Sequence, residues 1–375
     1  MMMVDYIQKY ILKKVFPFKE WISDLKNPKT LQADLIAGLT VALVLVPQSM
    51  AYAQLAGLPP YYGLYASFLP VAIASLFGSS RQLATGPVAV VSLLTAAALE
   101  PIASNDPSGY VAYAIMLAFL VGIFQLSLGL LRMGVLVDFL SQPVVRGFTN
   151  AAAIIIGTSQ LSKLFGVTVE SGEQHYQTVL SVISESLLNT HNPTLLMGIL
   201  AIFLIIFVRK VSVKLPAVLI SVAITTFISW YIEFETKYGG KVIGVVPDGL
   251  PAIQMPQIDF SQLINLGTVA IVISLIGFME AISIAKAMAT QTKQRLDADQ
   301  ELVGQGLSNI ASSFFQGYPV SGSFSVRSKY YCWSSYGIFI SCDRNSYWYN
   351  TIIFDTALVS HSTSYFGGRH YYCSN

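Results

Sequence analysis

Long apolar runs separated by short polar stretches dominate this sequence. The hydrocarbon core of a bilayer is about 30 Å thick, so a helix that rises about 1.5 Å per residue needs roughly 20 apolar residues to cross it. Residues 35–53 and 61–77 approach that length and predict the first two spans. The same pattern predicts later spans at residues 110–131, 147–164, 194–208, 215–232, 263–289 and 302–315. The sequence therefore predicts an all-α polytopic membrane protein with about nine crossing or partly crossing helices.

The third apolar run, residues 87–99, is too short to cross a bilayer. A helix of that length covers only about 20 Å, and we expect extended chain over residues 81–86 before it. Backbone polar groups at membrane depth are tolerated only where other protein or a cavity surrounds them. Secondary transporters build substrate sites from broken helices of this kind, so the pattern indicates a transporter rather than a membrane anchor.

The start of this short helix has the chemistry of an anion site. We expect Pro87 at the first helical position, where the missing N–H would have no partner in any case. The free N–H groups of Val88 and Ala89, together with the helix dipole, favour a bound anion just after Gly86. The alternative is that Gly86 and Pro87 only mark the start of a helix.

Two polar residues in the first span share one helix face. Gln48 and Tyr52 are four positions apart, which places them one turn from each other. Pro47 removes a backbone hydrogen bond beside them and can widen a cavity. The alternative for Gln48 is a hydrogen bond to a neighbouring helix, as glutamine often makes inside membranes.

Glu280 is an acidic residue within the predicted span at residues 263–289. A carboxylate in a span is costly and usually faces a cavity or a cation, so Glu280 is a candidate for binding a coupling proton or sodium ion. The alternatives are an ion pair with Lys286 and a position near the membrane boundary. Asp297, Asp299 and Glu301 are interpreted as the solvated start of a helix, where negative charge suits the dipole.

Composition agrees with a membrane protein and excludes several other classes. The chain has 375 residues, of which 54% are hydrophobic and 11% charged, whereas soluble domains carry about 25% charged residues. The net charge of +2 indicates no nucleic-acid partner. Cys332, Cys342 and Cys373 show no metal or disulfide spacing. Because the sequence shows no nucleophile–base or metal-ligand constellation, we expect no enzyme activity, no cofactor and no metal.

Charge placement predicts the topology. Five lysines between positions 13 and 29 place the N-terminal segment, residues 1–30, in the cytoplasm. This orientation places Lys237 and Lys241 outside. It places the other later basic residues on the cytoplasmic side only if residues 87–99 count as a full crossing: Arg81, Arg132, Arg209, Lys210, Lys214, Lys293 and Arg295. The stretch 267–289 echoes residues 38–54, and residues 318–324 echo residues 83–89. With seven spans before residue 263, the two copies would run in opposite directions, as inverted repeats do.

The last part of the chain, residues 326–375, has a different character. Tyrosine, serine and tryptophan replace the apolar periodicity, and no run is long enough to span. One interpretation is a polar, aromatic segment outside the membrane. The other is a shifted reading frame, because a one-base shift with permissive codons turns the segment from Cys332 to Asp355 into a membrane-like run. Under this second interpretation, the residues after about Ser325 carry no functional information.

Four long segments resemble, in order, the signatures of the sulfate permease (SulP) family of anion transporters. They read DLIAGLTVALVLVPQSMAYAQLAGLPPYYGLYASF, GSSRQLATGPVAVVSLL, FLSQPVVRGFTNAAAIIIGTSQL and ELVGQGLSNIASSFFQGYPVSGSFS. The resemblance, over residues 31–325, implies two inverted seven-helix repeats with short strands leading into the broken helices. It also implies a cytoplasmic STAS domain, and we expect that domain to be absent and the second repeat to be incomplete.

The same resemblance implies roles for individual residues. Gln48 would donate a hydrogen bond to the anion, and Tyr52 would form a wall of its pocket. Gly86, Val88 and Ala89 would form one half-site, and Ser323, Phe324 and Ser325 would form the facing one. Sulfate, bicarbonate, chloride and dicarboxylates all suit a site at a helix N-terminus.

Three functional hypotheses follow. The first is secondary transport of an inorganic anion across the plasma membrane, coupled to protons or sodium, by a multi-pass homodimer with a cytoplasmic N-terminus. The second is an inactive transporter fragment. The third is a nucleobase permease, which shares the broken-helix architecture.

Overall fold

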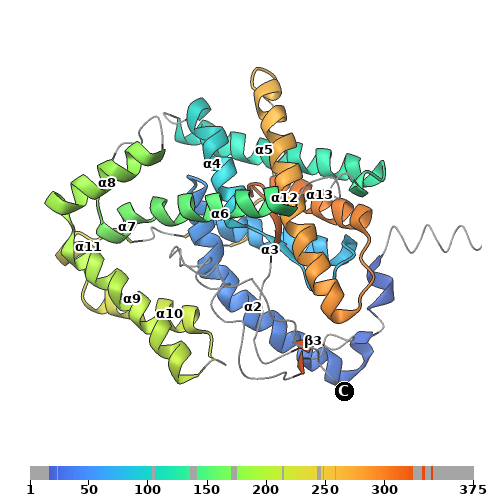
Figure 1. The fold of residues 1–375 in the computed structure, drawn as a ribbon, viewed down its shortest axis with the longest axis horizontal. Coiled ribbons are helices and arrows are strands. Elements are labelled where there is room, and N and C mark those ends of the chain that lie inside the picture. The colour runs from blue at the N-terminus through green and yellow to red at the C-terminus, as the bar shows by residue number, and fades with distance from the viewer. Residues whose placement is uncertain are drawn as a thin grey trace, which may run out of the picture.

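The computed structural model describes residues 17–22, 24–103, 106–135, 142–169, 175–212, 215–242, 246–247, 249–257, 259–323, 332–333 and 339–340. Helices dominate these ranges, and short strands complete them (Figure 1). The helices of the first part are η1 (Pro17–Glu20), η2 (Asp24–Lys26), α2 (Pro28–Leu55), α3 (Tyr61–Phe77), α4 (Ala89–Ala103) and α5 (Pro107–Leu130). Then come α6 (Gln142–Ser159), α7 (Leu161–Phe165), α8 (His175–Asn189), α9 (Asn192–Val211), α10 (Ala217–Tyr231), α11 (Phe234–Tyr238), α12 (Leu263–Thr292) and α13 (Ala298–Phe314). The strands are β1 (Ala84–Gly86), β2 (Ser321–Ser323), β3 (Cys332–Trp333) and β4 (Phe339–Ile340).

Within the described ranges, four helices contain a segment long and apolar enough to cross a membrane. These segments are Ala37–Leu55, Ser108–Leu130, Asn192–Val211 and Leu263–Ala289. Three further apolar helices, α3, α4 and α10, are shorter. The apolar pattern therefore predicted these helices at the right places, and α9 extends beyond the predicted residues 194–208.

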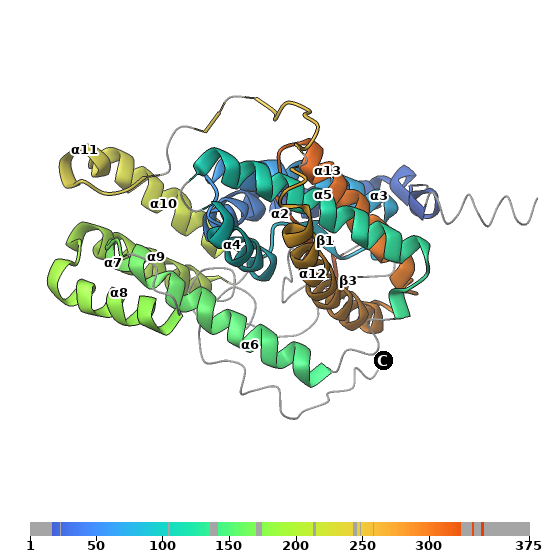
Figure 2. The same ribbon diagram turned by 90° about the horizontal axis from the view of Figure 1, so that it is seen from above.

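The helices form two groups. Figure 2 shows α7 to α11 on one side of the molecule, away from α3, α5 and α13, while α6 runs between the two groups. One buried cluster joins α2, α3, α4, α5 and α12 and includes Ala53, Val91, Leu117 and Ile273. A smaller cluster joins α6 to α4 through Ala152, Ile156 and Val90. The short helix α4, a half-helix that is too short to cross a bilayer, thus lies where the two groups meet.

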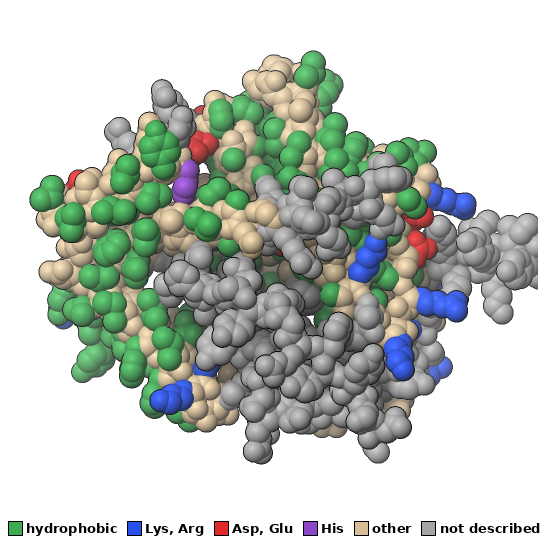
Figure 3. Space-filling view, in the orientation of Figure 1, with side chains coloured by type: hydrophobic (Ala, Val, Ile, Leu, Met, Phe, Trp, Pro, Cys, Tyr) green, Lys and Arg blue, Asp and Glu red, His purple; other side chains and the backbone are tan. Residues whose placement is uncertain are grey.

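The surface divides between apolar and charged side chains. Hydrophobic residues cover the face over α8 to α10 in Figure 3, and Lys and Arg gather at the opposite and lower edges. Along α9, the exposed large apolar side chains are Leu196, Ile199, Phe203, Ile206, Phe207 and Val211. Such a surface suits lipid contact, because large apolar patches are unfavourable in water.

The central helix α13 is buried although its sequence is only weakly apolar. It packs against α5 through small residues. A Cβ atom added at Gly122 of α5 would lie 2.6 Å from the backbone N of Ile310. A Cβ atom added at Gly306 of α13 would lie 2.5 Å from the backbone N of Leu126. Such small residues allow helix backbones to approach closely in membrane proteins.

Two short strands far apart in sequence pair in the interior. β1 and β2 are antiparallel, and their register joins Ala84 to Ser323, Thr85 to Gly322 and Gly86 to Ser321. Each strand follows a pair of packed helices, α2–α3 before β1 and α12–α13 before β2. Equivalent positions with opposite strand direction are the arrangement of an inverted repeat. The predicted architecture is therefore confirmed, with the second repeat described from α12 to β2.

One local expectation was wrong. The short helix begins at Ala89 rather than Pro87, because Gly86 is still paired with Ser321 and the carbonyl of Val88 accepts the first helical bond, from Ser92 N at 2.9 Å. Pro87 therefore precedes the helix. Between the predicted spans at residues 147–164 and 194–208, the structure adds the amphipathic helix α8, in which Val182 is buried.

Candidate functional site

The N-terminus of α4 lies in the protein interior. Gly86, Pro87 and Val88 are all buried. Because the first helical hydrogen bond is donated by Ser92, the N–H groups of Ala89, Val90 and Val91 have no acceptor within the helix. Buried N–H groups at a helix start, together with the positive end of the dipole, form an environment that favours an anion.

The chain at β2 is fixed close to the same point by α12. The Ser321 hydroxyl, fully buried, donates to the carbonyl of Gly277 at 2.7 Å. A Cβ atom added at Gly277 would lie 3.2 Å both from Ser321 Oγ and from Val91 Cγ2. At Gly277, therefore, α12, α4 and β2 come into direct contact.

The second half-site is described only in part. Ser323 is half-buried, pairs with Ala84, and donates from Oγ to the Ala84 carbonyl at 3.4 Å. Phe324 and Ser325, expected to belong to the same half-site, lie outside the described residues. The described chain thus contains all the residues of the first candidate half-site and the strand that leads to the second.

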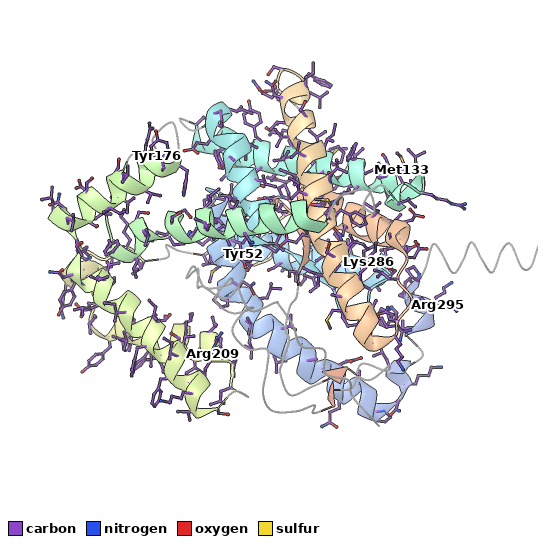
Figure 4. All side chains as sticks on the ribbon, viewed as in Figure 1. Tyr52, Met133, Tyr176, Arg209, Lys286 and Arg295 are labelled. Carbon is purple, nitrogen blue, oxygen red and sulfur yellow. The ribbon has the colours of Figure 1, made fainter. Side chains whose placement is uncertain are left out.

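Gln48 and Tyr52 share a helix face as predicted. Gln48 Nε2 donates to the Tyr52 hydroxyl at 3.1 Å, and α2 continues as a helix through Pro47. Tyr52 is buried, and Figure 4 shows it near the centre of the molecule. Ala53, the next residue of α2, belongs to the same buried cluster as Val91 of α4. The pair therefore lies on the helix that packs beside the first half-site.

Glu280 lies one helical turn after Gly277, the residue at which α12 contacts α4 and β2. It is half-buried, and its Oε2 atom is fully covered. The next residue, Ala281, contacts β2, since a Cβ atom added at Gly322 would lie 2.8 Å from Ala281 Cβ. Lys286 is exposed further toward the end of α12. Glu280 therefore lies on the turn of α12 that contacts β2.

Sequence reasoning missed the residues that fix the chain before β2. The Tyr318 and Ser92 hydroxyls, both fully buried, lie 3.2 Å apart and join this chain to α4. Ser312 Oγ donates to the Tyr318 carbonyl at 2.9 Å, and the Asn309 side chain bonds both backbone polar groups of Val320. The one available signal was a run of polar residues spaced four apart on α13.

A separate cavity of about 410 Å³ opens between α2, α4 and α5. Its lining includes Gln54, Leu55, Ala96, Glu100 and Tyr110. Because Ala96 and Glu100 belong to the later turns of α4, this cavity lies away from the helix N-terminus. Within the described ranges, no group of three or more His, Cys, Asp or Glu side chains is placed to hold a metal ion.

The fold and site define a polytopic membrane protein of the inverted-repeat class, with a buried half-helix that begins at a strand pair. The chain belongs to the sulfate permease family, whose sequence model, described as "Sulfate permease family", matches residues 31–330. The resemblance of the four sequence segments to this family is thus confirmed.

Named relatives and solved structures agree with this assignment. "Sulfate transporter 4.1, chloroplastic" of Arabidopsis thaliana is 38% identical over 333 residues, which are 87% of this chain and 47% of the relative. The structure described as "The overall structure of SLC26A9" gives a TM-score of 0.80 at 25% identity, covering 86% of this chain and 53% of that one. "The transmembrane domain of a cyanobacterium bicarbonate transporter BicA" gives a TM-score of 0.70 at 25% identity, covering 80% and 76%. The chain spans about half the length of the curated relatives it matches.

Proposed function

We propose that this chain carries part of a secondary active transporter that moves a small inorganic anion across a membrane. The observation that supports this most directly is the pairing of Gly86 with Ser321. This pairing joins the buried start of α4 to the strand that leads into the second repeat. The named relatives make sulfate and bicarbonate the first candidates, and dicarboxylates are a further class suited to a site of this polarity.

In this proposal the anion lies between two half-sites. The N–H groups of Val88 and Ala89 donate to it from the first half-site, beside Gly86. Ser323, Phe324 and Ser325 supply the second. Gln48 keeps one N–H on the Tyr52 hydroxyl and donates its second N–H to the anion, and Tyr52 covers one side of the pocket.

Glu280 is the proposed coupling residue. Its position one turn from the Gly277 contact supports a role linked to the site, because a bound cation or proton there changes the field at the anion. A proton is our first choice, and sodium is the second.

The proposed protein is a multi-pass homodimer of the plasma membrane with a cytoplasmic N-terminus. The orientation rests on the lysines before α2, and on Arg209, Lys210, Lys293 and Arg295, which follow alternate crossings. Cross-linking in native membranes tests the dimer, and protease protection of an N-terminal tag tests the orientation.

We further propose that residues 326–375 are read out of frame and that residues 31–325 form the transport domain. The loss of apolar periodicity after Ser325 supports this. Resequencing the gene across the codons for Ser325 to Tyr331 tests it. The proposal fails if no one-base shift restores an apolar reading frame beyond Asn375.

Uptake into proteoliposomes tests the function. The purified chain and a frame-restored version are each given labelled sulfate, bicarbonate, a dicarboxylate and uracil. Anion uptake by both supports the proposal. Uptake by the restored chain alone favours the inactive-fragment hypothesis, and uptake of uracil favours the nucleobase permease.

A further inference from the structure

A buried carboxylate at the start of α13 holds the chain that leads into β1. Glu301 is 3% exposed, and its Oε2 atom accepts from Ser79 N at 2.9 Å, Ser80 N at 2.9 Å and Ser79 Oγ at 3.0 Å. Burial of a carboxylate is costly unless hydrogen bonds compensate it. The interpretation of Glu301 as a solvated residue was therefore wrong, although Asp297 beside it is exposed.

Other residues also hold the chain that links α3 to β1. Ser79 Oγ also donates to the Asp297 carbonyl at 2.9 Å, and Gln294 Nε2 donates to the Ser79 carbonyl at 2.8 Å. Gly304 and Gly78 touch through their backbones, because a Cβ atom at Gly304 would lie 2.7 Å from Gly78 Cα. The link between α3 and β1 is thus bound to α13 and to the turn before it.

Asn309 holds the other strand in the same way. It lies eight residues after Glu301 on α13. Its Oδ1 accepts from Val320 N at 2.8 Å, and its Nδ2 donates to the Val320 carbonyl at 2.9 Å. A second bond runs from Nδ2 to Gln125 Oε1 of α5 at 3.0 Å. Asn309 and Val320 are fully buried, and Val320 directly precedes β2.

We propose that Glu301 and Asn309 are positioning residues of the anion site, and that α13 acts as the clamp that sets the spacing of its two half-sites. Each residue holds the chain that leads into one strand of the β1–β2 pair. Because both contacts start from one buried helix, the first half-site cannot shift relative to the second without breaking one of them. Neither side chain needs to touch the anion. This inference rests on the proposed function for its link to anion affinity, but the clamp itself is a property of the fold.

Four variants separate the clamp from general stability. Glu301→Ala removes all three acceptor contacts, whereas Glu301→Gln keeps an oxygen that can accept from Ser79 and Ser80. Ser308→Ala is the matched control, because the Ser308 hydroxyl is equally buried on α13 but donates to the Pro70 carbonyl of α3 and to Gly304. Asn309→Ala tests the contact that holds the chain leading into β2.

Hydrogen exchange in lipid nanodiscs measures the clamp without any anion. We expect Glu301→Ala to speed exchange about tenfold across residues 79–88, because the N–H groups of Ser79 and Ser80 lose their acceptor. Glu301→Gln restores most of the protection, and Ser308→Ala leaves it unchanged. Asn309→Ala speeds exchange across residues 318–323. Unchanged exchange in both Glu301→Ala and Asn309→Ala overturns the clamp. An effect of Ser308→Ala as large as theirs also overturns it.

Sulfate uptake by proteoliposomes tests the link to the site. We expect Glu301→Ala to raise KM several-fold with a smaller effect on the maximal rate, and Glu301→Gln to recover the KM. Faster exchange with an unchanged KM overturns the positioning role. If the wild-type chain takes up none of the tested anions, the proposed function fails, while the exchange result still decides the clamp.

Discussion

Gly86 and Ser321 face each other across the β1–β2 pair, although 235 positions separate them in the sequence. Gly86 lies three residues before the start of α4, and Ser321 is bound to Gly277 of α12. The pairing therefore joins the first repeat, the second repeat and the candidate anion site at one place in the interior.

Ala89→Pro tests whether backbone N–H groups bind the anion. Proline suits the first helical position and removes one N–H that has no helical acceptor, so α4 stays folded. We expect anion KM to rise about tenfold, because a hydrogen bond to a charged group contributes about 1.5–3 kcal/mol. Uptake kinetics in proteoliposomes measure this.

The control is Ala298→Pro, which makes the same change at the first residue of α13. The capping bonds there run from Asp299 N and Gln300 N to Asp297, so the control keeps them. Equal kinetics for Ala89→Pro and the wild type would argue against the proposed half-site.

Gln48→Ala tests the side-chain donor on α2. The amide is held by the Tyr52 hydroxyl at 3.1 Å, which leaves its second N–H for the anion. We expect KM to rise by roughly tenfold, while the protein inserts into the membrane normally. Gln32→Ala, at the exposed start of the same helix, is the control. An unchanged KM would favour the packing role.

Glu280→Gln tests coupling. The amide keeps the shape of the side chain but cannot take up a coupling proton, so we expect uptake driven by a pH gradient to be abolished. The variant should still insert and exchange anions without a gradient. Glu235→Gln, on the exposed helix α11, is the control. An unchanged dependence on the pH gradient, with lost dependence on sodium, would assign the site to sodium.

Tyr318→Phe and Ser92→Ala test the hydroxyl pair that joins α4 to the chain before β2. A double-mutant cycle on unfolding in detergent should give a coupling of about 1 kcal/mol, the usual contribution of one hydrogen bond. Additive effects of the two substitutions would show that the 3.2 Å contact does not stabilise the fold.

The apolar pattern predicted the places of the main helices, the shortness of α4 and the inverted repeat. It also put Gln48 and Tyr52 on one face, since four positions on a helix form one turn. The start of α4 was placed two residues too early, because the pairing of Gly86 with Ser321 holds the chain extended. Rules that use only neighbouring residues do not identify Ser321 as the partner of Gly86.

The sequence by itself determined which segments lie in the membrane and which one is a half-helix, because hydrophobic period and length depend only on neighbouring residues. Only the tertiary structure decided the roles of Glu301 and Asn309. An acidic residue at a helix start suits the dipole whether it is solvated or buried, so its sequence position cannot tell the two apart. The donors of Glu301 are Ser79 and Ser80, more than 200 positions away, and packing alone brings them to it.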